Sequence, residues 1–87
     1  MYVIVVYDVN EKRVGKVCQF LRRYLPHIQN SVFEGDLTES KLEAVKTGLR
    51  KIMVEDEDSA ILWAFRDSRW SDRQVIGTEK KPVSNFL

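Results

Sequence analysis

The 87-residue sequence is poor in reactive and helix-breaking residues, with one cysteine, one histidine, two prolines and four glycines. A single cysteine excludes a disulfide within the chain, and one histidine with one cysteine cannot build a typical zinc centre or catalytic triad. The longest apolar run is far shorter than the about 20 residues that a membrane-spanning helix needs. No signal-like segment precedes the first apolar run. We therefore expect a cytoplasmic protein with no membrane partner.

The excess of one sign of charge is also small, because 14 basic residues nearly balance 13 acidic ones and the net charge is +1. The charges are nevertheless unevenly distributed along the chain. Residues 11–25 hold five basic side chains and one acid, whereas residues 34–58 hold eight acids and four bases. One part of the surface could therefore face phosphates while another repels them. The length predicts a single domain over residues 1–87, with a core over about 1–79 and a C-terminal tail over 80–87.

Apolar periodicity predicts four strands and two helices. Asn10 and Thr38 are suitable N-cap residues for the two helices, and Pro26 should end the first of them. Gly35 and Asp36 read as a turn. The strands are expected over residues 2–7, 28–34, 60–65 and 74–78. We predict an α+β fold, a ferredoxin-like β-α-β-β-α-β sandwich, with a short C-terminal strand that could pair across a dimer.

Two predicted strands, residues 2–7 and 60–65, are apolar throughout, as a central pair should be. In this architecture two helices cover only one face of the sheet, yet strands of this kind need both faces buried. We infer that a second copy of the chain covers the open face across a two-fold axis. On this interpretation Trp63 belongs to the core.

Asp8 ends the first apolar run and is the sharpest candidate for chemistry. It could be an acid attracted to the positive end of the following helix. It could also be a ligand of Mg²⁺ or another divalent cation, which is typically held by one or two carboxylates together with water and phosphate. A two-fold dimer would supply two copies of Asp8, and both interpretations stay open.

A basic stripe on the first helix is the second candidate, formed at helical spacing by Lys12, Lys16, Gln19 and Arg23. It is either a solvated face or a phosphate-binding surface. Three arginines (Arg66, Arg69 and Arg73) surround Trp70, a pattern that suits nucleic acid, a protein partner or a packed hairpin. Cys18 is expected in the core, and His27 is expected to fill a junction without a catalytic role.

Three segments, VIVVYDV, KRVGKVCQFLRRYL and QNSVFEGDL, resemble the small CRISPR-associated protein of the adaptation machinery, the partner of the CRISPR integrase. The resemblance covers nearly the whole chain. It implies a ferredoxin-like homodimer whose members are described as Mg²⁺-dependent endonucleases on single-stranded RNA or double-stranded DNA. It also implies a role in spacer acquisition, in which the dimer bridges integrase dimers and holds the spacer DNA duplex.

The resemblance implies that Asp8, one copy from each protomer, is the catalytic and metal-binding residue. Combined with the basic stripe, it gives a predicted nucleic-acid-binding set of Lys12, Arg13, Lys16 and Arg23. The residues expected near the site are Tyr7, Asn10, Ser31 and Phe33, of which Phe33 is expected to pack in the sheet. Two alternatives to a nuclease remain open: a purely structural DNA-binding adaptor and a stand-alone toxin-like endoribonuclease.

Overall fold

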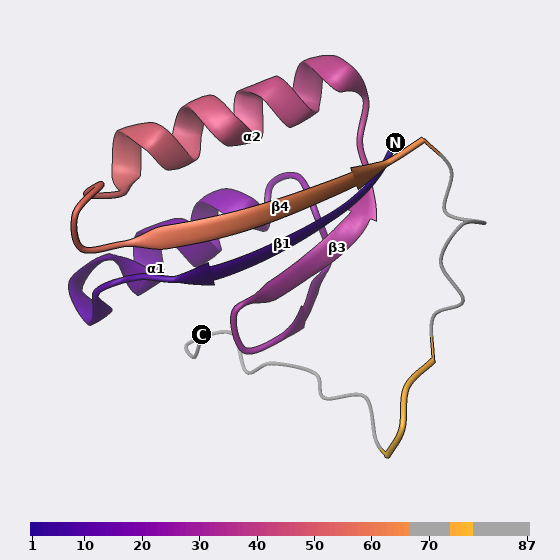
Figure 1. Ribbon diagram of the computed structural model, residues 1–87, viewed down its shortest axis with the longest axis horizontal. Coiled ribbons are helices and arrows are strands. Elements are labelled where there is room, and N and C mark those ends of the chain that lie inside the picture. The colour runs from indigo at the N-terminus through magenta and orange to yellow at the C-terminus, as the bar shows by residue number, and fades with distance from the viewer. Residues whose placement is uncertain (67–73, 78–87) are drawn as a thin grey trace.

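The computed structural model describes residues 1–66 and 74–77 as a four-stranded antiparallel sheet with two helices on one of its faces (Figure 1). The elements follow in the order β1 (Tyr2–Asp8), α1 (Glu11–Leu21), β2 (His27–Gln29), β3 (Val32–Asp36), α2 (Glu39–Ile52) and β4 (Ser59–Phe65). The strand order in the sheet is β2-β3-β1-β4. This arrangement confirms the predicted ferredoxin-like β-α-β-β-α-β fold, although its order arises from two strands within residues 27–36, whereas the predicted strand ranges alone would follow β-α-β-α-β-β.

Both helices begin at the predicted caps. The side chain of Asn10 accepts a hydrogen bond from the Lys12 amide at 3.0 Å, and the Thr38 hydroxyl accepts one from the Lys41 amide at 3.2 Å. Helix α1 ends at Leu21, before Pro26, and the amides of Arg23 and Tyr24 then bond three residues back and tighten the chain into turns. Among the described residues, neither helix is long and apolar enough to cross a membrane.

The strand predicted over residues 28–34 is in fact two strands, β2 and β3. Asn30 turns the chain between them with a φ of 40°, a left-handed conformation that asparagine tolerates better than most residues. The turn predicted at Gly35 and Asp36 is also wrong, because both residues continue β3 and pair with β1. The predicted strand over 74–78 is absent at residues 74–77, and Thr78 and the tail lie outside the described residues.

The central pair also differs from the prediction. Strand β1 lies between β3 and β4, so the central strands are β1 and β3, and β4 is an edge strand of the described sheet. The apolar character of residues 60–65 therefore does not come from a central position. It needs another explanation, which lies in the face of the sheet that the helices leave uncovered.

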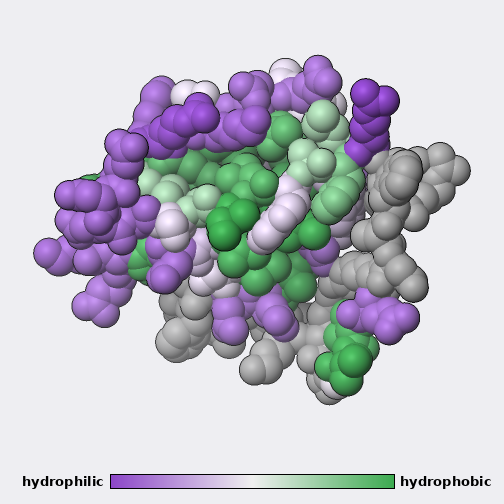
Figure 2. All heavy atoms as spheres, viewed as in Figure 1, coloured by the Kyte–Doolittle hydropathy of each residue, from purple (hydrophilic) through white to green (hydrophobic). Residues whose placement is uncertain are grey.

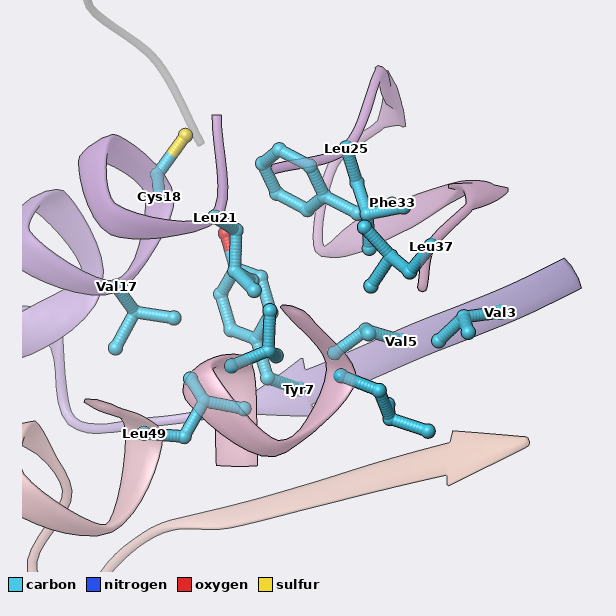
Figure 3. Packing of buried hydrophobic residues seen from close by; sticks show 12 residues of the cluster. Val3, Val5, Tyr7, Val17, Cys18, Leu21, Leu25, Phe33, Leu37 and Leu49 are labelled. Atoms are coloured by element: carbon cyan, nitrogen blue, oxygen red, sulfur yellow. The ribbon is translucent and has the colours of Figure 1, made fainter. Parts of the chain in front are cut away.

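The core lies between the sheet and the two helices (Figure 3). Val3, Val5 and Tyr7 alternate along β1 and point toward the helices, while Phe33 on β3 is completely buried among them. The helices and loops complete the cluster with Val17, Cys18, Leu21, Leu25, Leu37, Leu42, Val45 and Leu49. The burial of Cys18 and Phe33 confirms that both are packing residues.

Candidate functional site

Asp8 lies on the face of the sheet that carries no helix. Side chains alternate along a strand, and the buried set on β1 is Val3, Val5 and Tyr7, so Asp8 belongs to the opposite set. Its partner across the ladder is Ser59, the first residue of β4. The Asp8 side chain is exposed, and no group in the described part of the chain forms a hydrogen bond or an ion pair with it. The carboxylate is therefore available to a ligand.

The same face exposes large apolar side chains. Ile61 is 54% exposed and Trp63 is 45% exposed, and they pair across the ladder with Val6 and Ile4 of β1. Figure 2 shows this hydrophobic area over β1 and β4. The prediction that Trp63 lies in the core is wrong, because on β4 it is Leu62, not its neighbours, that packs against the core. A second copy of the chain on this face remains a prediction that the apolar area favours.

Asp58 is the residue that sequence reasoning missed. A run of four acids such as Glu55–Asp58 is typical of a solvated loop, but the Asp58 side chain is fully buried. Its two oxygens accept hydrogen bonds from the backbone amides of Asn10 and Val54, both at 2.8 Å, and from Arg13. The signal available in the sequence was the position of Asp58, the acid that directly precedes an apolar strand.

Arg13 forms a two-pronged ion pair with Asp58. Its Nε donates to Oδ2 at 2.6 Å and its Nη2 donates to Oδ1 at 3.1 Å, and Nη2 also contacts Glu57 at 3.0 Å. The guanidinium holds the pKa of the Asp58 carboxyl well below its usual range, and the amides of Val54 and Asn10 act in the same direction. Arg13 thus has its donors directed inward, although the resemblance implied a phosphate contact.

The residues of the basic stripe, unlike Arg13, face solvent. Lys12 and Lys16 lie one helical turn apart on α1, Gln19 continues the same face, and Arg23 lies in the turn that follows the helix. All four side chains are exposed. Their binding of nucleic acid stays a prediction, and the structure separates them clearly from Arg13.

The residues predicted near Asp8 divide between two places. Asn10 lies in the junction that joins β1 to α1 and is bonded to Asp58 through its amide. Tyr7 and Phe33 lie in the core on the helix-covered side of the sheet, with ring centroids 6.2 Å apart. Burial raises the pKa of the Tyr7 hydroxyl well above its usual value. Ser31 lies in the turn before β3, where its carbonyl accepts a hydrogen bond from the Tyr7 amide.

His27 has a structural role, as expected. Its ring stacks on Phe33 with centroids 4.3 Å apart and planes 9° apart, and its Nε2 lies 2.6 Å from the Asn30 carbonyl oxygen. Its Nδ1 lies 3.7 Å from the sulfur of Cys18. These contacts fix the ring at the β2 turn, so the histidine stabilises the turn on the side of the sheet away from Asp8.

A divalent metal would find one suitable ligand in each chain. No three histidine, cysteine, aspartate or glutamate side chains come together within residues 1–66 and 74–77. An exposed, unpaired carboxylate fits Mg²⁺, which usually keeps several waters and takes only one or two protein carboxylates. Asp8 alone therefore fits such an ion as a single ligand, to be completed by water, substrate or a second copy of the chain.

These features define a small ferredoxin-like α+β domain with an exposed carboxylate at the end of a central strand and exposed basic side chains on the helix that follows it. The family model of the CRISPR associated protein Cas2 matches residues 1–73. The chain therefore belongs to the Cas2 family, which confirms the resemblance seen in the sequence.

Individual relatives agree with this assignment. The chain is 50% identical to a "CRISPR-associated endoribonuclease Cas2" of Dictyoglomus turgidum over the full length of both chains. It is 46% identical to one of Methanocaldococcus jannaschii over all of this chain and 76% of that protein. The crystal structure of Streptococcus pyogenes Cas2 at pH 6.5 superposes with a TM-score of 0.77 at 30% identity, covering 88% of this chain and 100% of that one.

Proposed function

We propose that this protein is a Mg²⁺-dependent endoribonuclease that hydrolyses phosphodiester bonds in single-stranded RNA. The observation that carries the proposal is Asp8, an exposed and unpaired carboxylate at the end of central strand β1. The names of the relatives, which are called endoribonucleases, support RNA as the substrate. Double-stranded DNA is the alternative substrate.

In this proposal the active form is a homodimer joined through the helix-free faces of two sheets. The exposed Ile61 and Trp63 would be covered by the partner, and each chain would bring one Asp8 to the shared surface. Two carboxylates brought together repel each other, and this repulsion favours a bound cation. When bound, Mg²⁺ stabilises charge on the scissile phosphate and lowers the pKa of a bound water.

The chain's own residues would then have separate tasks. Asp8 would hold the cation and orient its water, while the exposed Lys12, Lys16 and Arg23 would attract the phosphates of the nucleic acid. The apolar contact around Trp63 would limit the access of bulk water from the sheet side. No such task falls to Tyr7 or Phe33, because both are buried on the other face.

The test is cleavage of labelled single-stranded RNA and duplex DNA by the wild-type protein and the Asp8→Asn variant, each with Mg²⁺ and with a chelator. Asp56→Asn is a matched control, because Asp56 is an exposed aspartate in the loop before β4. We expect Asp8→Asn to lose Mg²⁺-dependent cleavage and Asp56→Asn to keep it. Equal cleavage by the wild type and Asp8→Asn would exclude Asp8 from the reaction.

We also propose a role in spacer acquisition, in which the dimer holds the spacer DNA duplex between integrase dimers. The exposed basic stripe favours this second function, since it can bind phosphates without any catalysis. Asp8→Asn should keep DNA and integrase binding. The triple variant Lys12→Ala, Lys16→Ala, Arg23→Ala should bind DNA more weakly, with the slope of log affinity against log salt reduced by about 0.9 for each phosphate that is no longer neutralised.

An unchanged slope in the triple variant would show that the stripe is only a solvated face. A dimer that cleaves RNA but does not bind the integrase would instead indicate a stand-alone endoribonuclease of the toxin type.

A further inference from the structure

We propose that the buried Asp58, together with Arg13, is a positioning residue that fixes the strand end carrying Asp8. The inference rests on the proposed metal-dependent role of Asp8. It assigns Arg13 a different task from the phosphate contact that the sequence suggested. We call the Arg13–Asp58 pair, with its two backbone donors, the clasp.

The clasp joins two segments that are distant in sequence, residues 10–13 and residues 54–58. The Asp58 carboxylate accepts from the Asn10 amide at the start of α1 and from the Val54 amide after α2, both at 2.8 Å. Arg13 adds two further donors from the first turn of α1, at 2.6 and 3.1 Å. A single carboxylate therefore fixes the β1–α1 junction against the α2–β4 loop.

The backbone of Asp8 is part of a closed loop of contacts. It lies two residues before Asn10 along the chain and pairs across the ladder with Ser59, the neighbour of Asp58. The backbone consequently closes a small circuit that runs from Asp8 to Asn10, across to Asp58, and through Ser59 back to Asp8. Loss of the Asp58 carboxylate charge would weaken the Asn10–Asp58 connection of this circuit, and loss of Arg13 would leave Asp58 buried without its charged donor. Either change would loosen the end of β1.

Burial distinguishes the clasp from an ordinary surface ion pair. The Asp58 side chain is fully buried, and the Arg13 side chain is only 18% exposed. Exposed pairs contribute little because water screens them, whereas a buried carboxylate left without donors is strongly unfavourable. The clasp also neutralises Asp58, so that Asp8 remains the unpaired carboxylate of this strand end.

For function, the consequence is that Arg13 and Asp58 should affect the binding of the cation, and not the binding of the nucleic acid. Removing a group that positions a metal ligand without contacting the metal typically lowers metal affinity or activity about 10- to 100-fold. A phosphate-binding arginine would instead change the affinity for RNA. The two roles for Arg13 therefore predict different measurements.

The experiment compares full-length Arg13→Ala, Asp58→Asn and the double variant with the wild type. Mn²⁺ serves as the probe, since it prefers the same oxygen ligands as Mg²⁺, and its dissociation constant is read from the paramagnetic resonance signal of free Mn²⁺. The kcat and KM for single-stranded RNA are measured alongside. Lys12→Ala is the contrasting control, because Lys12 neighbours Arg13 but belongs to the exposed stripe.

We expect both single variants to weaken Mn²⁺ binding by about 10-fold or more and to lower kcat, with the KM for RNA nearly unchanged. The double variant should be no worse than either single variant, because each already removes the Arg13–Asp58 ion pair. Lys12→Ala should raise KM and leave Mn²⁺ binding unchanged. Arg13→Lys, which keeps one charged donor, should recover part of the Mn²⁺ affinity and covers the case in which Asp58→Asn does not fold.

Other results would overturn the inference in distinguishable ways. If Arg13→Ala raises KM without changing Mn²⁺ affinity, and Asp58→Asn changes neither, Arg13 is a direct phosphate contact and the positioning role is refuted. If the wild type neither binds Mn²⁺ nor cleaves RNA, the proposed function itself fails, and the positioning role fails with it.

Discussion

Replacing Trp63 with alanine tests whether the helix-free face of the sheet is the contact between two copies of the chain. Trp63 is 45% exposed in the single chain and lies on the edge strand β4, beside Ile4 in the ladder. Its removal should weaken the dimer far more than it weakens the fold of one protomer. The exposed part of the Trp63 ring makes few contacts within its own protomer, so its loss should change the stability of that protomer little.

The magnitude follows from the area that a partner would cover. Since a large aromatic residue buries up to about 250 Å², an exposed fraction of 45% corresponds to about 110 Å² in each protomer. At about 25 cal/mol per Å² this is about 3 kcal/mol per protomer, or about 6 kcal/mol for the two copies. Complete coverage of Trp63 would therefore make the dissociation constant of the Trp63→Ala dimer about 10⁴-fold weaker.

Sedimentation equilibrium over a wide range of protein concentration measures this constant for both proteins. Lys51→Ala is a suitable control, because Lys51 is exposed on α2, away from the apolar area. Its dissociation constant should equal that of the wild type. A Trp63→Ala protein that dimerises as tightly as the wild type would refute the proposed contact, as would a wild type that is monomeric at every concentration.

Two further predictions concern the stability of the fold. Asp58 has a pKa below its usual range because Arg13 donates to it, so its stabilising contribution is complete above the unfolded-state pKa of about 3.9 and is lost as the pH falls through the folded-state value. In urea unfolding, the wild type should therefore lose stability below about pH 4 more steeply than Asp58→Asn. Parallel curves of stability against pH for the two proteins would contradict this. Gly15→Ala, with open space around the new methyl group, should stabilise α1 by about 1 kcal/mol. Gly48→Ala should be less stable than Gly15→Ala by about 1–3 kcal/mol, because its methyl group would meet the ring of Phe20, and equal unfolding midpoints for the two variants would show that the ring moves aside without cost.

Much of the fold could be predicted because it depends on local patterns. The caps at Asn10 and Thr38 and the helical spacing of apolar residues locate both helices correctly. The division of residues 28–34 into β2 and β3 depends on one backbone conformation, that of Asn30. Hydrophobic alternation does not register such a turn, because the turn takes up only a few polar residues between Ile28 and Val32.

The site shows the same limit in another form. Asp8 stands out in the sequence because it ends an apolar run, whereas Asp58 is one of four consecutive acids, and its position before an apolar strand is a much weaker signal. What sets Asp58 apart is its contact with Arg13, 45 residues away, which only the folded chain brings about. The same contact explains why the sequence alone placed Arg13 with Lys12, Lys16 and Arg23 in the set expected to bind nucleic acid.

The apolar character of β1 on both faces has a consequence for the register in which the strand pairs with its neighbours. A shift by one residue would exchange the two sets of side chains, and the residues from Val3 to Val6 would suit either side almost equally well. Asp8 breaks this equivalence, because the shifted strand would place its carboxylate under the helices without a partner. Asp8 thus also specifies the pairing register of β1 in the sheet. Even a chain that cleaves nothing would have reason to keep a polar residue there.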